Sequence, residues 1–353
     1  MRTFTFKGLL LTAVFMLLGC LSIQAANDDL ITKQITIKLD KAGTLPNKIA
    51  SSEMYKITNL KIIGEINGTD WNMIREMAGR NYQESSTEGN LSVLDLSEAK
   101  IVAGGDYYYY DNLFNNKVYT SNDEIGEYAF AYCSGLTSLT LPVGITSIGE
   151  FAFSGCSGLT SLTLPAGITS IGEYAFYGCS GLTSLNLPAG ITEIGESTFS
   201  DCSGLTSLTL PAGITSIDKY AFSGCSRLTS LTLPAGITSI GEFAFSYCSG
   251  LTSIYVYAEK VPRIGRYAFE GCASRKCTLY VPKGTYDNYR LSEFGYFENI
   301  VEFDATGIDK TTTSTDVEEV SRYSLNGQRL AVPVKGLNIV KYSDGTVRKV
   351  VVK

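Results

Sequence analysis

Apolar and hydroxyl residues alternate in short runs through the middle of the chain. In residues 159–164, LTSLTL, the three leucines fall on one side of an extended chain and Thr163 falls on the other, which is typical of a short, half-buried strand. Pro165 then ends the strand and turns the chain. Residues 168–176, ITSIGEYAF, add two isoleucines, an alanine and a phenylalanine that we expect to face the same interior.

This unit recurs along the chain with a fixed period of 23 residues. Six cysteines mark its register, at Cys133, Cys156, Cys179, Cys202, Cys225 and Cys248. A fixed period of this length indicates one supersecondary unit per repeat, stacked on its neighbours in a solenoid. We therefore predict that residues 121–305 form a repeat solenoid that includes a C-terminal cap.

The recurring cysteines are predicted to be free thiols inside the solenoid, where cysteine acts as a small apolar residue. Stacked coils hold successive Cα atoms about 4.8 Å apart with parallel Cβ vectors, so the Cβ atoms lie beyond the separation of about 3.8 Å that is usual in a disulfide. A metal site needs ligands that converge on one point, whereas the cysteines are spread along the solenoid axis. A nucleophilic cysteine needs exposure and a nearby base. Neither role therefore fits the recurring cysteines. An even number of cysteines in an exported chain is otherwise typical of a disulfide framework.

The beginning of the chain has the pattern of an export signal. Basic residues are followed by an apolar stretch over residues 8–23 and by small residues, so residues 1–26 are predicted to be a signal peptide cleaved near Ala25 or Ala26. The alternative is lipidation of Cys20 in the segment LLGC. No later apolar run approaches the roughly 18 residues of a membrane-spanning helix, and no span is expected after the signal is removed.

Residues 27–120 are predicted to contain an N-terminal cap and the first, irregular repeats. This segment includes a predicted helix that is capped near Thr69 and has Trp71 on its apolar face. The aromatic insertion GGDYYYYDN, residues 104–112, is interpreted as a loop lying over the first coils, and stacking of its tyrosines on sugars is the alternative.

The end of the chain departs from the repeat. A strand and a helix near residues 285–297 are predicted to close the solenoid, and residues 306–321 form a polar linker. Residues 322–353 are predicted to be β-hairpins around the dipeptides NG and DG. With the flanking helices included, the predicted fold class is an α+β repeat solenoid with an N-terminal cap and a small all-β C-terminal tail.

Charge and composition exclude some function classes. Residues 121–250 carry ten Asp or Glu against only Lys219 and Arg227, which disfavours nucleic acid because its binding depends on neutralising phosphates. The chain has no histidine, so the usual general base and a common metal ligand are both missing. We predict no catalytic residues, no cofactor and no metal site, and therefore no enzyme.

The repeat CSGLTSLTLPAGITSIGEYAF resembles the BspA-like leucine-rich repeats of bacterial surface proteins. The resemblance implies a leucine-rich repeat fold and adhesion to host proteins and to other bacteria, while Gly167, in place of the more usual Asn or Cys, leaves the curvature open. The segments LNGQRL, KGLNIV and KVVVK of the tail resemble the C-terminal sorting tail of type IX secretion substrates. That likeness implies a secreted protein, or one on the outer-membrane surface of a Gram-negative bacterium.

The outward positions of the predicted first strand form a candidate ligand face of hydroxyl-rich residues. They are Thr140, Thr163, Asn186, Thr209, Thr232 and Tyr255. A second outward row is mostly acidic and is interpreted as a solvated face: Glu127, Glu150, Glu173, Glu196, Lys219 and Glu242. A third outward row is aromatic, with a break at Ser197: Tyr128, Phe151, Tyr174, Tyr220, Phe243 and Tyr267.

The predicted function is an exported cell-surface adhesin or binding module. Its expected partner is a host extracellular protein or glycan, or another cell surface. The alternative is a lipoprotein, anchored in the periplasm or at the surface, that acts as a scaffold or spacer. Carboxylate pairs at glycosidase spacing arise in any such ladder, and nothing in the repeats distinguishes one pair from the next.

Overall fold

The computed structural model describes most of the chain outside its two ends. The described residues are 29–112, 115–305, 319–324, 329–330, 332, 335–342 and 347–352. The predicted signal peptide with Cys20, most of the predicted linker, and the NG and DG dipeptides of the tail lie outside the described residues.

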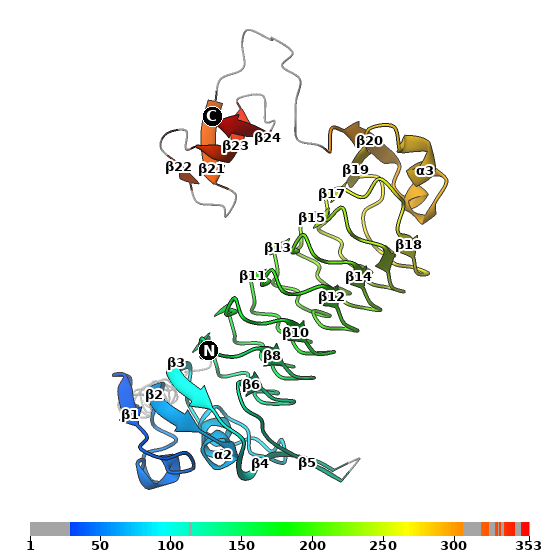
Figure 1. The fold of residues 1–353 in the computed structure, drawn as a ribbon. Helices are drawn as coiled ribbons and strands as arrows, with labels where there is room; N and C mark the ends of the chain where they lie inside the picture. Colours follow the sequence, from blue (N-terminus) through cyan, green and yellow to red (C-terminus); the bar gives the residue numbers. More distant parts are fainter. Residues whose placement is uncertain are drawn as a thin grey trace, which may run out of the picture.

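The repeats form a β-solenoid of stacked coils with little helix, in one gently twisted row (Figure 1). The longer strand of each coil lies at β7 (Ser138–Thr140), β9 (Ser161–Thr163), β11 (Ser184–Asn186), β13 (Ser207–Thr209), β15 (Ser230–Leu233) and β17 (Ser253–Val256). The shorter strand lies at β6 (Glu124–Ile125), β8 (Ser147–Ile148), β10 (Ser170–Ile171), β12 (Glu193–Ile194), β14 (Ser216–Ile217), β16 (Ser239–Ile240) and β18 (Arg263–Ile264).

The coils pair in parallel, with each residue beside its counterpart in the next repeat. Leu139 pairs with Leu162, and Leu185 pairs with Leu208. A threonine at the start of each longer strand reinforces this register, because the Oγ1 atom of Thr160 donates a hydrogen bond of 3.2 Å to the carbonyl oxygen of Thr137. The same bond recurs in the following coils, so the exposed edge of each strand is also held by side chains.

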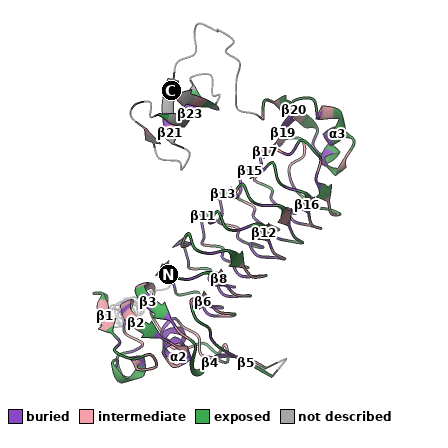
Figure 2. Ribbon diagram, viewed as in Figure 1, coloured by how far each residue is buried: buried purple, intermediate pink, exposed green. Residues whose placement is uncertain are grey.

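The interior of the coils is a set of ladders of identical residues. Phe153 stacks on Phe176 with ring centroids 5.1 Å apart and ring planes 10° from parallel, and the ladder continues in both directions. The leucines of each strand, the alanine and the cysteine fill the space around these rings, and Figure 2 shows buried residues recurring in every coil. This ladder is the hydrophobic core of the solenoid.

Before the regular coils, the chain forms a segment that shares their sheet. Its elements are β1 (Ile35–Lys38), η1 (Leu45–Asn47), β2 (Asn59–Ile66), α2 (Gly68–Met77), β3 (Val93–Ile101), β4 (Gly104–Asp111) and β5 (Asn116–Thr120). The strand order β1-β2-β3-β7-β9 extends the face formed by the longer strands. Trp71 is buried and donates a hydrogen bond of 2.9 Å from Nε1 to the carbonyl oxygen of Ala129 in the first coil.

The N-cap of α2 differs from the prediction. It is Asn67 rather than Thr69, and its side chain accepts a hydrogen bond from the backbone of Thr69 while Asp70 accepts one from the backbone of Asn67. This reciprocal pair is a capping box. Asp70 fulfils two roles, because it also accepts from the backbone of Leu45.

After the last regular coil come β19 (Thr278–Pro282), α3 (Tyr286–Arg290), η2 (Glu293–Tyr296) and β20 (Asn299–Phe303). The helix predicted near residues 285–297 is therefore interrupted, because Ser292 is extended and its side chain caps a new 3-10 turn by accepting from the backbone of Phe294. The α+β label is not confirmed, since the repeats contain no helix and the described residues form only the two short α-helices α2 and α3.

The tail forms a separate antiparallel sheet in the order β22-β21-β23-β24. Its strands are β21 (Glu319–Ser324), β22 (Arg329–Leu330), β23 (Gly336–Tyr342) and β24 (Val347–Val352). The strand β21 begins inside the segment predicted as a linker. Within the sheet, Arg322 donates a hydrogen bond of 3.2 Å to the side-chain oxygen of Asn338.

We expect Phe176→Ala to lower the free energy of unfolding by about 3–5 kcal/mol, because it leaves a cavity between two stacked rings. Urea titration followed by circular dichroism measures the loss. Val143→Ala is the control, since Val143 is 79 % exposed and its truncation should change the free energy by less than about 0.5 kcal/mol. Equal effects of the two substitutions would show that the ladder is not the stabilising core.

Candidate binding surface

The longer strands present one continuous polar face. Its outward residues are exposed on five successive strands and half-buried on the sixth: Thr140, Thr163, Asn186, Thr209, Thr232 and Tyr255. Parallel pairing places counterparts side by side, as for Asn186 and Thr209. These six residues, called the strand face from here on, carry no charged group. The face offers hydroxyl and amide groups that can donate and accept hydrogen bonds.

The strand face ends in an aromatic cluster that sequence reasoning did not find. Tyr255 stacks on Tyr280 with ring centroids 4.4 Å apart, and the ring of Phe303 meets Tyr255 edge-on. Burial, followed by the neighbouring Tyr280, raises the pKa of the Tyr255 hydroxyl. The only sequence signal for this cluster is that Tyr280 occupies the outward position of the next strand, which lies beyond the strict repeat.

The predicted aromatic row is a stacked ladder rather than a set of free side chains. Tyr128 stacks on Phe151 at 5.0 Å, and Phe151 stacks on Tyr174 at 4.7 Å. Tyr109, from the insertion, stacks on Tyr128 at 4.1 Å and forms the first rung. The insertion, predicted as a loop, is instead strand β4 of the hairpin β4–β5; it packs on the first coil as expected. The ladder breaks at Ser197, which is buried, and resumes through three rings at Tyr220, Phe243 and Tyr267.

The rungs of this ladder have an unusual backbone conformation. The repeated position has φ between 52° and 57° in every coil, including the rungs Tyr128, Phe151 and Tyr174. A side chain in this left-handed region costs about 1–2 kcal/mol per residue. Glycine would avoid that cost, but it has no ring to stack. We interpret the stacking as the compensation that lets each coil turn at an aromatic residue.

The acidic row lies beside this ladder. Burial, followed by the flanking carboxylates of Glu127 and Glu173, raises the pKa of Glu150. Tyr174 donates a hydrogen bond of 3.0 Å to the side chain of Glu196. No ion pair involves this row in the described part of the chain.

The cysteine ladder is buried, and all six residues are free thiols. Each thiol from the second onward donates a hydrogen bond to the carbonyl oxygen of the core phenylalanine of the preceding coil, as from Cys179 to Phe153 at 3.1 Å. Burial raises the pKa of Cys202 to about 12, so this thiol is neutral and unreactive near neutral pH. Cys277, outside the ladder, is also free and buried.

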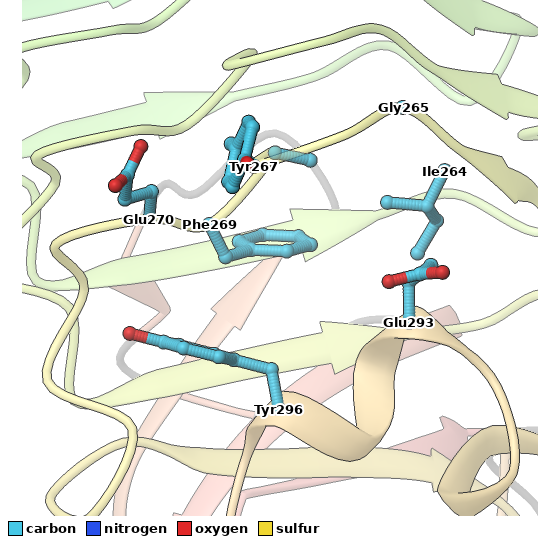
Figure 3. Close-up of a pocket in the computed structure, with 8 residues that line it drawn as sticks. Ile264, Gly265, Tyr267, Phe269, Glu270, Glu293 and Tyr296 are labelled. Carbon is cyan, nitrogen blue, oxygen red and sulfur yellow. The ribbon is translucent and has the colours of Figure 1, made fainter.

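A pocket of about 360 Å³ lies between the last coil and the turn η2 (Figure 3). Its lining residues are Ile264, Gly265, Tyr267, Ala268, Phe269, Glu270, Glu293 and Tyr296. Sequence reasoning missed it because two of its eight lining residues, Glu293 and Tyr296, belong to a segment without the repeat. The available signal is Glu270, which stands where four of the earlier coils have a serine.

Within the residues that the structure describes, no group of three or more Cys, Asp and Glu residues is placed to hold a metal ion. Among the described helices, none has the length and apolar character needed to cross a membrane.

Comparison with known families gives a match over more than half of the chain. The family model described as "BspA type Leucine rich repeat region (6 copies)" matches residues 103–227, 174–292 and 215–328. A comparison with curated proteins finds no match.

Several solved structures are also similar. A leucine-rich repeat protein from T. pallidum is 28 % identical, with a TM-score of 0.41, over 48 % of this chain and 76 % of that protein. A leucine-rich cell surface protein from Faecalibacterium prausnitzii is 31 % identical, with a TM-score of 0.35; the match covers 46 % of this chain and 47 % of that protein. A leucine-rich repeat protein from Bacteroides ovatus is 22 % identical, with a TM-score of 0.42; the match covers 77 % of this chain and 70 % of that protein.

The buried thiols predict a loss of stability at alkaline pH. The unfolded chain releases a thiol proton near pH 8.5, whereas the folded chain keeps the proton of Cys202 up to a pKa of about 12. The neutral thiol therefore makes its full contribution to the free energy of unfolding below about pH 8.5. That contribution falls as the pH rises from about 8.5 towards the folded pKa of about 12, by at most about 1.4 kcal/mol per pH unit and per thiol.

We expect Cys202→Ala to lose less stability than the unmodified protein between pH 8 and pH 10.5, measured by urea unfolding at each pH. The non-titrating control Ser134→Ala should follow the unmodified protein. An alanine variant that loses as much stability as the unmodified protein would contradict a neutral buried thiol.

Proposed function

Because the chain belongs to the BspA-type leucine-rich repeat family, we propose that it is a cell-surface binding module that holds an extracellular protein against its strand face. The observation that carries this proposal is the strand face itself, an uncharged, exposed surface that runs over consecutive coils. Its outward side chains include no carboxylate, thiol or basic group, so the proposed role is binding rather than catalysis.

The chemistry of the strand face suits a broad protein partner. Threonine has few rotamers because its Cβ is branched, so ordering it in an interface costs less side-chain entropy than ordering a long polar side chain. The backbone beneath is already held by the ladder of threonine hydrogen bonds. The face is therefore rigid before the partner arrives, which lowers the cost of binding.

A glycan is the second candidate ligand. The supporting observation is the aromatic cluster at the end of the strand face, where Tyr255 and Tyr280 stack beside Phe303. Tyrosine presents an apolar ring face together with a hydroxyl group, and that combination suits the apolar face and the hydroxyl groups of a sugar. Such a ligand would contact the last coils only.

We also propose the route by which the protein reaches the surface. Residues 1–26 act as a cleaved export signal, and the tail acts as a type IX sorting signal that directs the chain to the outer-membrane surface of a Gram-negative bacterium. The support is the residue pattern at both ends and the separate sheet that the tail forms. The alternative is a lipoprotein anchored through Cys20, which would act as a scaffold or spacer.

The strand face can be tested with a triple substitution. Replacing Thr163, Asn186 and Thr209 with lysine places three positive charges on adjacent strands, and these disrupt a neutral or basic partner through repulsion and lost contacts. We expect binding to the best ligand from a panel of immobilised matrix proteins and glycans to weaken at least tenfold, about 1.4 kcal/mol. Circular dichroism should remain native because all three side chains are exposed.

The matched control replaces Glu150, Glu173 and Glu196 with glutamine on the neighbouring acidic row. It should leave binding unchanged. If the glutamine triple abolishes binding and the lysine triple does not, then the acidic row is the active surface, and the proposal for the strand face is wrong.

Deletion of residues 308–353 tests the sorting role of the tail. The tail has its own sheet, so we expect the truncated solenoid to fold and to accumulate in the periplasm. Cell fractionation and surface protease digestion locate it. Surface display of the truncated chain would refute the sorting role, and loss of membrane attachment on Cys20→Ser would establish the lipoprotein instead.

A further inference from the structure

The pocket at the end of the solenoid is built where the outer aromatic ladder stops. Tyr267 is the last rung and stacks on Phe243 at 5.2 Å. Within the described residues no further ring stacks on its other side, and its side chain is 58 % exposed. The pocket therefore exposes one face of the Tyr267 ring. In the earlier rungs the corresponding face is covered by the next ring of the ladder, except where the ladder breaks at Ser197.

The remaining aromatic walls are held rigidly. Phe269 is buried and contacts Phe294 and Phe297 at ring distances of 5.5 and 5.2 Å. Tyr296 is 44 % exposed, and its hydroxyl donates a hydrogen bond of 2.9 Å to the carbonyl oxygen of Cys272. The rings thus keep their positions without a ligand, which reduces the cost of binding one.

The charged residues of the lining are both acidic. Glu270 and Glu293 lie on either side of the rings of Phe269 and Tyr296 (Figure 3), and no lysine or arginine lines the pocket. Neither carboxylate has a hydrogen bond or ion pair with a described residue. Other carboxylates of the same segment are engaged, as Glu298 is by Arg275 at 2.9 Å.

We propose that this pocket binds an arginine side chain of a protein partner. A guanidinium group is attracted to the faces of tyrosine and phenylalanine rings, and its flat, weakly hydrated shape fits between rings better than an ammonium group does. Charge-assisted hydrogen bonds to carboxylates are about twice as strong as neutral ones. Both carboxylates are exposed to solvent, so a neutral sugar would gain no charge attraction from them.

This inference rests on the proposed function only in taking the ligand to be a protein, and the test does not require that partner. The probe is the peptide acetyl-Gly-Arg-Gly-amide, titrated into the full chain and followed by ligand-observed NMR. The matched peptide contains citrulline, which has the shape of arginine without its charge. We expect the citrulline peptide to bind at least tenfold more weakly.

Variants locate the site. Glu270→Gln with Glu293→Gln should weaken binding of the arginine peptide at least tenfold, and Tyr267→Ala, which removes an exposed ring, should also weaken it. The control pair, Glu150→Gln with Glu173→Gln, removes the same charge from the acidic row, whose residues do not line this pocket, and should leave the affinity within twofold. Raising the salt concentration should weaken binding to the unmodified protein.

Several results would overturn the proposal. They are equal binding of the arginine and citrulline peptides, no binding of the arginine peptide, or an equal loss in the control pair. Binding of a methyl pyranoside that Tyr267→Ala removes, without binding of the arginine peptide, would assign the pocket to glycans. The lysine triple on the strand face should leave peptide binding unchanged, so failure of the strand face and failure of the pocket are separate outcomes.

Discussion

The stacking of each residue on its counterpart 23 residues further along the chain is the constraint on which the rest of the structure depends. Leucine pairs with leucine, phenylalanine stacks on phenylalanine, and each thiol reaches the carbonyl oxygen of the previous coil. A single coil has neither a core nor partners for its backbone, so stability arises between neighbours. A substitution inside one coil therefore affects packing at two interfaces, with the coil before it and with the coil after it.

The same constraint explains why aromatic residues occupy a conformation that favours glycine. Each coil must turn at the position of Tyr128, Phe151 and Tyr174, where φ is positive. Tyr128 and Phe151 have a stacked ring on both sides, and Tyr174 has one on a single side; this gain offsets the repeated local cost. At Ser197 the ring is missing while the backbone conformation persists, so the neighbouring coils impose the turn and the ring is not required for it.

Much of the solenoid could be predicted because the period fixes which residues share a side. The alternation in residues 159–164 identified the strand, and a strict ladder made a disulfide framework geometrically poor. Features without a period were harder. The cap at Asn67 depends on Asp70 reaching back to the backbone, and Ser292 interrupts the predicted helix near residues 285–297. The pocket was missed because Glu293 and Tyr296 meet Tyr267 only after the chain has folded back on the last coil.

A regular repeat also limits where specific recognition can arise. Nearly identical coils present a threonine hydroxyl group at every exposed step of the strand face except Asn186, so most coils would offer a partner the same group. Specificity therefore requires positions where the repeat changes. The chain has such changes at its C-terminal end, where Tyr255 meets Tyr280 and where Glu270 and Glu293 flank the rings of Phe269 and Tyr296. A partner that spans the strand face and reaches this end would gain affinity from the repeats and its register from the irregular residues.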